Sequence, residues 1–161
     1  MAPCRSALAD LSYADVSTTH NAFTHFSFFE GLQPEAIAFL DSLAEKRELG
    51  PATVVFHQGD LGNDVFFLVE GSVEVLSLGE GRPSQRLAVL QAPTLFGEMS
   101  LIECAPRSAT VKTLTDCRLH VLFSTDMYQL FEKWPDQYAL LLHRLARTMA
   151  RRLRGLDHDS T

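Results

Sequence analysis

The sequence predicts a mainly β domain with helices at both ends. Between residues 48 and 123, short apolar segments alternate with glycine, proline, asparagine and aspartate, which is the pattern of short strands separated by turns. Many short strands at this spacing are typical of an antiparallel sandwich or barrel. The chain has 161 residues, 46% of them apolar, which is enough for one domain with its own core.

The first part of the chain predicts a tail followed by helix. Residues 1–22 are interpreted as a tail that contains a short helix somewhere in 5–16. The next ten residues, 23–32, contain four phenylalanines, and aromatic side chains this dense usually anchor a segment onto a core. Pro34 suits the first position of a helix, and Ile37, Leu40 and Leu43 follow at helical spacing. We expect this helix to end near Arg47.

Six strands are expected in the central region. Alternation of apolar and polar residues, as in 72–75, supports half-buried strands, and the intervening glycines and prolines mark the turns. The expected strands are Val54–His57, Val65–Glu70, Val73–Leu78, Arg86–Leu90, Ala109–Leu114 and Arg118–Phe123.

Two helices are expected at the end of the chain. Ser124 is predicted to cap a helix that runs to about Lys133, and Pro135 to begin a longer one. Along the longer helix, mostly apolar residues recur at steps of three and four, which fits either a coiled-coil-like seam or packing on the chain's own barrel. These residues are Tyr138, Leu142, Leu145, Met149, Arg152 and Leu156. The domain is therefore expected to span residues 23–156, with the β-roll at about 48–123, the C-terminal helices at about 124–155 and a tail at 157–161.

Composition argues against several classes of function. The net charge of −6 gives no general reason to bind nucleic acid or an acidic membrane, and no apolar run approaches the ~20 residues that cross a bilayer. The three cysteines are odd in number and lack CxxC spacing, and the six histidines form neither HxH nor HExxH. We therefore predict a cytoplasmic protein that is not an enzyme and has no catalytic residues, metal site or cofactor.

One segment, 96–111, reads as an anion-binding loop built around an arginine. Its sequence is FGEMSLIECAPRSATV. Arg107 supplies a planar fork suited to a phosphate, and Gly97 lets the backbone approach a ligand closely. A short helical turn at 98–103 would aim N–H groups at an anion. Glu98 repels a phosphate but can accept a hydrogen bond from a ribose hydroxyl. The pattern indicates a nucleotide whose phosphate and sugar share one compact ring.

This segment resembles the phosphate-binding cassette of the cyclic nucleotide-binding domain family. Residues 54–76, VVFHQGDLGNDVFFLVEGSVEVL, are similar to the family's jelly-roll region. The resemblance implies a double-stranded β-helix (jelly-roll) barrel with N-terminal helices and two C-terminal helices. One departure precedes the cassette, since Ala92-Pro93-Thr94 stands where the family often has Gly-Asp. The turn that enters the cassette is therefore expected to differ in shape.

The resemblance also implies a set of ligand-binding residues. The cassette contributes the phosphate and ribose contacts, the barrel contributes a wall against the purine, and the last helix contributes an arginine that approaches the purine or a partner subunit. The predicted site residues are Gly97, Glu98, Met99, Ser100, Arg107, Ser108, Ala109, Val75, Leu87, Leu90 and Arg152.

The resemblance implies a receptor for a cyclic nucleotide, cAMP in the first place and cGMP as the alternative, because Ser108 is compatible with either purine. No DNA-binding helix-turn-helix follows, so the domain is expected to act alone and to signal through its C-terminal helices to a separate effector protein. A homodimer through the last helix is a further expected partner. The alternative is a scaffold or protein-interaction module whose site is degenerate or binds another anion, such as a cyclic dinucleotide.

Overall fold

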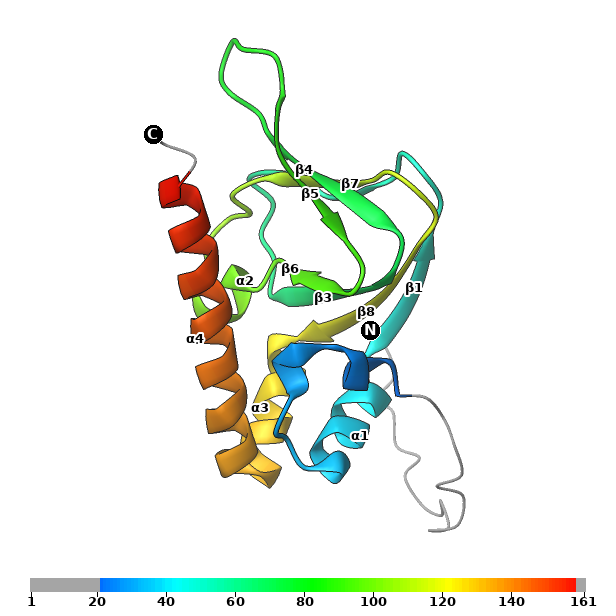
Figure 1. The fold of residues 1–161 in the computed structure, drawn as a ribbon, viewed down its shortest axis with the longest axis vertical. Coiled ribbons are helices and arrows are strands. Elements are labelled where there is room, and N and C mark those ends of the chain that lie inside the picture. Colours follow the sequence, from blue (N-terminus) through cyan, green and yellow to red (C-terminus); the bar gives the residue numbers. More distant parts are fainter. Residues whose placement is uncertain (1–20, 159–161) are drawn as a thin grey trace, which may run out of the picture.

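The structure, a computed structural model, describes residues 21–158. The short helix predicted within 5–16 lies outside the described residues. Eight strands form two four-stranded antiparallel sheets with the orders β1-β8-β3-β6 and β2-β7-β4-β5 (Figure 1). The strands are β1 Glu45–Leu49, β2 Val54–Phe56, β3 Asp64–Glu70, β4 Ser72–Ser77, β5 Gln85–Gln91, β6 Thr94–Phe96, β7 Thr110–Thr113 and β8 Cys117–Phe123.

The helices gather at one end of the roll and along its side. η1, η2, α1 and α3 lie beside the first sheet, and α4 runs past the short α2 (Figure 1). Their bounds are η1 Ala22–His25, η2 Ser27–Phe29, α1 Pro34–Leu43, α2 Met99–Ile102, α3 Ser124–Lys133 and α4 Pro135–His158. This arrangement confirms the predicted jelly-roll barrel with N-terminal helices and two C-terminal helices.

The prediction that the first helix reaches Arg47 was wrong. α1 ends at Leu43, and residues 45–49 form β1 instead. These residues, EKREL, favour a helix by intrinsic propensity, but their backbone pairs with β8 from Glu45 opposite Val121 to Leu49 opposite Cys117. Cross-strand pairing therefore overrides local propensity here. The three-residue β6, which pairs with β3, was also not predicted.

The start of α3 differs in detail from the prediction. Ser124 is the first helical residue, and Phe123 occupies the cap position. The Asp126 carboxylate accepts a hydrogen bond of 2.7 Å from the Phe123 backbone N–H. A carboxylate two residues after Ser124 thus satisfies a backbone donor at the helix start, in place of the predicted serine hydroxyl.

The helices are fixed to the barrel by a cluster that we call the helical core. Its centre is Phe67 of β3, whose ring lies 5.0, 5.4, 5.7 and 5.1 Å, between centroids, from those of Phe23, Phe26, Phe28 and Phe29. The phenylalanine-rich segment therefore anchors the N-terminal helices, as its composition predicts. The other buried members are Leu32, Ala36, Leu40, Val65, Leu95, Leu122, Met127, Leu130, Leu141 and Leu145.

The expected seam on α4 is divided between two faces. Leu145 is buried in the helical core, and Tyr138 and Met149 pack against it, whereas Leu142 is exposed. The side chain of Leu156 lies outside the described residues. Packing on the chain's own barrel thus accounts for one face of α4. Of the helices described, none is long and apolar enough to cross a membrane.

Candidate functional site

The cassette wraps around the side chain of Arg107. Gly97, which follows β6, has a φ of 78°, in the left-handed region that favours glycine. A Cβ atom at Gly97 would lie 2.8 Å from Nη1 of Arg107, and one at Gly62 would lie 2.5 Å from both Nε and Nη2. Both distances are too short for real atoms. The two glycines therefore leave the space that the guanidinium occupies.

The backbone of Arg107 is held by the loop between β2 and β3. Its N–H donates to the carbonyl of Asp60, and its own carbonyl accepts from the N–H of Gly59, both at 2.8 Å. The preceding Pro106 forms an isolated β-bridge with Leu61. These contacts fix where the side chain of Arg107 leaves the backbone, and they join two segments that are far apart in sequence.

The guanidinium of Arg107 makes four hydrogen bonds within the chain. Nη1 donates to the carbonyl oxygen of Gly97 at 3.0 Å and to Oγ of Ser100 at 2.8 Å. Nη2 donates to the carbonyl oxygen of Asp64 at 3.2 Å and to the Asp64 carboxylate. Arg107 is thus a buried cation that already has a counter-anion, and its side chain is only 4% exposed.

Aromatic rings complete the surroundings of Arg107. The guanidinium carbon lies 4.2 Å from the ring centroid of Phe56 and 5.7 Å from that of Phe66. A cation this close to an aromatic face gains electrostatic stabilisation. Burial lowers the pKa of the Arg107 guanidinium, and the negative charge of Asp64 opposes that shift. Arginine keeps its proton at neutral pH, so the Arg107 side chain retains its positive charge.

The second charged residue of the cassette, Glu98, contacts the last helix. Nη1 of Arg152 donates to Oε1 of Glu98, and Nη2 of Arg152 donates to the carbonyl oxygen of Leu95. Glu98 is buried, while the side chain of Arg152 is 38% exposed. The end of α4 is therefore tied to the cassette by one ion pair and one hydrogen bond.

A family model decides what kind of domain this is. The model described as "Cyclic nucleotide-binding domain" matches residues 46–133, which is more than half of the chain and includes the whole cassette. The chain belongs to the cyclic nucleotide-binding domain family.

Curated relatives and solved structures agree with the family match. The "Cyclic AMP receptor protein" of Thermus thermophilus is 36% identical over 129 residues, covering 80% of this chain and 58% of the relative. The crystal structure of the Thermus thermophilus catabolite activator protein aligns with a TM-score of 0.72 and 35% identity, over 82% of this chain and 60% of that one. A cyclic nucleotide-binding domain from Methylobacillus flagellatus aligns with a TM-score of 0.74 and 26% identity, over 79% and 71%. The chain spans a little more than half the length of the first two.

Several of the predicted cassette residues of this cyclic nucleotide-binding domain lie together around the guanidinium of Arg107. Gly97, Ser100 and Arg107 are in direct contact, and Glu98 adjoins them. The short turn expected at 98–103 is α2. Ala109 is buried, whereas Ser108 and Met99 are exposed.

The predicted purine wall is only partly assembled. Val75 and Leu90 are half-buried against the barrel core, the cluster between the two sheets built from Phe66, Leu68, Val73, Phe96, Val111, Cys117, Leu119 and Val121. Leu87 is exposed on β5, where the pairing with β4 slips by one residue between Val75 and Leu76. Leu87 also lies three residues from Leu90, and alternation along a strand puts residues an odd number of positions apart on opposite faces, so Leu87 does not share the side of Leu90.

The structure adds residues that the sequence analysis did not select. Asp64, Gly62 and Phe56 all contact Arg107 or make room for it, yet residues 62–64 were interpreted only as turn residues. A usable signal was present, because a buried arginine requires an acidic partner and Asp64 stands at the start of a strand in the same family-like region.

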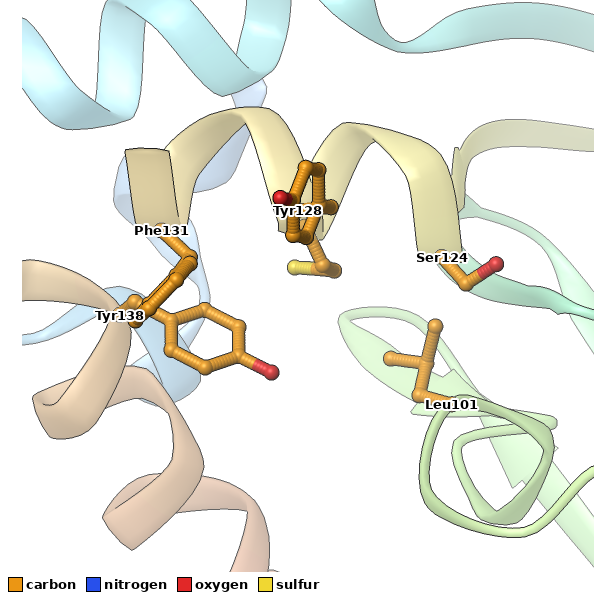
Figure 2. Close-up of a pocket in the computed structure, with 6 residues that line it drawn as sticks. Leu101, Ser124, Tyr128, Phe131 and Tyr138 are labelled. Carbon is orange, nitrogen blue, oxygen red and sulfur yellow. The ribbon is translucent and has the colours of Figure 1, made fainter. Parts of the chain in front are cut away.

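Two other kinds of site are relevant to residues 21–158, a metal-ion site and a surface pocket. No group of three or more histidine, cysteine, aspartate or glutamate side chains in this part of the chain could hold a metal ion. A surface pocket of about 350 Å³ lies between α2, α3 and α4. Figure 2 shows Leu101 of α2 facing Ser124, Tyr128 and Phe131 of α3, with Tyr138 of α4 at the far side.

Proposed function

We propose that this domain is a cytoplasmic receptor for a 3′,5′-cyclic nucleotide, with cAMP as its ligand, and that it is not an enzyme. The observation that carries the proposal is the buried cation at Arg107, enclosed by Gly62, Gly97 and Ser100 within a family cassette. Burying an arginine is costly, so the side chain is retained for a purpose that needs its charge. The similarity to the cyclic AMP receptor protein of Thermus thermophilus supports cAMP over cGMP.

In this proposal each predicted residue has one task. Arg107 pairs with the cyclic phosphate, and Gly97, Ser100, Ser108 and Ala109 offer close backbone approach and further donors. Glu98 accepts a hydrogen bond from the ribose 2′-hydroxyl through the carboxylate oxygen that Arg152 does not use. The wall formed by Val75 and Leu90 buries one edge of the base, and Met99 and Leu87 lie at the rim of the site.

We propose that occupancy is relayed through α3 and α4. A ligand shifts these helices only if it binds one of their arrangements better than the other. Two features of the chain could supply that difference. Glu98 would have to share its carboxylate between Arg152 and the ribose, and the pocket in Figure 2 leaves room between Leu101 and α3 for a change in packing.

We propose that the partner that recognises the shifted helices is a separate effector protein or a second copy of the chain. Leu142 and Leu153 are apolar residues of α4 that the barrel leaves exposed, and they suit a helix–helix contact between two copies. That the domain acts alone stays a prediction.

Calorimetry with cAMP and cGMP tests the receptor assignment. Replacing Arg107 by alanine leaves the phosphate without its partner in a dry site, which costs roughly 2–5 kcal/mol, so we expect Arg107→Ala to weaken cAMP binding at least about 30-fold. The matched control is Arg118→Ala, because Arg118 is a partly exposed arginine whose ion pair is with Glu70, a residue outside the cassette. Thermal unfolding of each variant checks that it is folded.

A second measurement avoids substitution of a buried residue. The wild-type protein should bind 2′-deoxy-cAMP more weakly than cAMP, because the deoxy compound cannot donate to Glu98, and Glu98→Gln should reduce that difference. Equal cAMP affinity in wild type and Arg107→Ala contradicts the site assignment. Tenfold tighter binding of cGMP contradicts the choice of base, and failure of millimolar cAMP and cGMP to raise the melting temperature favours the scaffold alternative.

A further inference from the structure

The hydrogen bonds of Arg107 leave too few donors for a ligand. A guanidinium carries five N–H groups, two on each terminal nitrogen and one on Nε. Nη1 and Nη2 each make two hydrogen bonds within the chain. A two-fold contact with a phosphate needs two N–H groups side by side. At least one internal bond must therefore break before a cyclic phosphate can pair with Arg107 in that way.

The acceptors of these bonds differ in charge. The carbonyl oxygens of Gly97 and Asp64 and the hydroxyl of Ser100 are neutral, so they can remain near a bound phosphate. The Asp64 carboxylate is an anion, and it lies directly on Nη2. A phosphate brought to the same guanidinium would meet a like charge at close range. Of the four contacts, the one to the Asp64 carboxylate is the one that the ligand opposes most strongly.

Further carboxylates near Arg107 also repel an anionic ligand. The negative charges of Asp60 and Glu98 also act on Arg107, although neither carboxylate accepts a hydrogen bond from it. Arg152 offsets Glu98 through its ion pair. Counting Arg107 and Arg152 against Asp64, Asp60 and Glu98, the formal charge around the cassette is −1, from +2 and −3. An anionic ligand therefore does not enter a site with surplus positive charge.

We propose that Asp64 sets the ligand affinity of the site by acting as an internal counter-anion of Arg107, which an anionic ligand must displace. This inference rests on the proposed function and adds to it a regulatory contact. Without ligand, the pair keeps the buried cation neutralised. With ligand, the Asp64 carboxylate turns away from Arg107. Asp64 is the first residue of β3 and is partly exposed, so its carboxylate can then be hydrated. The site thus exchanges one anion for another.

Asp64 could act on ligand binding in two ways, and they predict opposite changes in the cAMP affinity of Asp64→Asn. If its carboxylate only positioned Arg107 for the ligand, removing the charge would weaken binding. If the carboxylate competes with the ligand, Asp64→Asn should tighten cAMP binding by about tenfold, the scale of one charge-assisted hydrogen bond. The sign of the change separates the two roles. Asp64→Asn is nearly isosteric and can still accept a hydrogen bond from Nη2 through its amide oxygen.

The experiment compares cAMP affinity by calorimetry in wild type, Asp64→Asn and Asp60→Asn. Asp60→Asn is the matched control, since it removes a nearby charge that is not bonded to Arg107, and it should change the affinity less than Asp64→Asn. Melting temperatures are measured with and without cAMP. Ligand-free Asp64→Asn should melt below wild type, because Arg107 loses its counter-anion, and saturating cAMP should raise its melting temperature by more than that of wild type.

The outcomes separate this inference from the proposed function. Tighter binding by Asp64→Asn supports it, including the case in which only this variant binds detectably. Equal or weaker binding by the variant, with clear binding by wild type, overturns the inference and leaves the receptor assignment standing. Absence of binding by both overturns both. Asp64→Ser, a second neutral variant, is measured in the same way should Asp64→Asn fail to fold.

Discussion

The two halves of α4 are attached to the barrel by different forces. In the first half, Leu141 and Leu145 are fully packed in the helical core beside Phe67. In the second half, Arg152 reaches the cassette through its ion pair with Glu98 and its hydrogen bond to Leu95. Apolar packing has no substitute in water, whereas a partly exposed ion pair can be exchanged for other polar contacts at little cost. Under the proposed function, the half of the helix next to the cassette is therefore the half that we expect to respond to a ligand.

The largest effect on the free energy of unfolding is expected from a substitution that removes apolar packing in the first half of α4. Leu145 is 2% exposed, so Leu145→Ala leaves a cavity in the helical core and should lower the free energy of unfolding by about 2–5 kcal/mol. Leu153→Ala on the same helix is the control, because Leu153 is 63% exposed and its loss should change stability by less than about 0.5 kcal/mol. Urea unfolding measures both. Similar losses in the two variants would mean that α4 is not anchored in the way described.

A smaller effect on stability is expected from His120, a buried histidine that packs against Phe23 of the helical core. The His120 ring lies against Phe23, with centroids 5.5 Å apart, and its Nδ1 is 3.4 Å from Oδ1 of Asp41. Burial lowers the pKa of His120; Asp41 opposes the shift, while Lys46 and Arg118 reinforce it. The folded state therefore binds a proton less readily than the unfolded state.

The sign of the pH dependence follows from that pKa. Stability from His120 is complete above the unfolded pKa near 6.5, and it falls as the pH drops from there toward the lower folded pKa, by at most about 1.4 kcal/mol per pH unit for one proton. Urea unfolding at pH 7.5 and 5.5 measures the loss, and His120→Gln should reduce it. A variant with the same pH dependence as wild type would assign the loss to other groups.

The smallest change in global stability is expected from removing the ion pair that holds the second half of α4 to the cassette. Arg152→Gln removes an ion pair whose arginine is partly exposed, so the free energy of unfolding should fall by less than about 1 kcal/mol. Amide exchange in the last turns of α4 should nevertheless become faster, with no change around Leu141. In the wild type, cAMP should alter exchange in the same turns. Identical protection with and without cAMP throughout 124–158 would contradict the proposed relay.

The sequence predicted the regular parts of this fold well because their signals are local. Glycine and proline mark the turns, so six strands were predicted close to their observed bounds, and Pro34 and Pro135 mark the starts of α1 and α4. β1 was missed because its residues favour a helix when read alone. Only the pairing with β8, more than 60 residues away in sequence, makes them a strand.

The candidate site was predictable in its cassette and not in its partners. Arg107, Glu98 and Gly97 stand in one recognisable segment, so their proximity follows from the family pattern. Arg152 was predicted as a site residue but its pairing with Glu98 was not, and Asp64 was not selected at all, because which cation pairs with which carboxylate depends on how distant parts of the chain come together. The outward side of Leu87 was predictable from the sequence, because Leu87 lies three residues from Leu90 and alternation puts the two on opposite faces of a strand.

The missing side chain at Gly62 has a consequence for judging distant members of the family. Any other residue there would place an atom 2.5 Å from the guanidinium of Arg107 and force it out of its position. In a chain that keeps the arginine but carries a bulkier residue at the equivalent place, the guanidinium is therefore expected to lie differently even though the cassette sequence looks intact. Comparing that one position helps to judge whether a related chain holds its arginine in the same way.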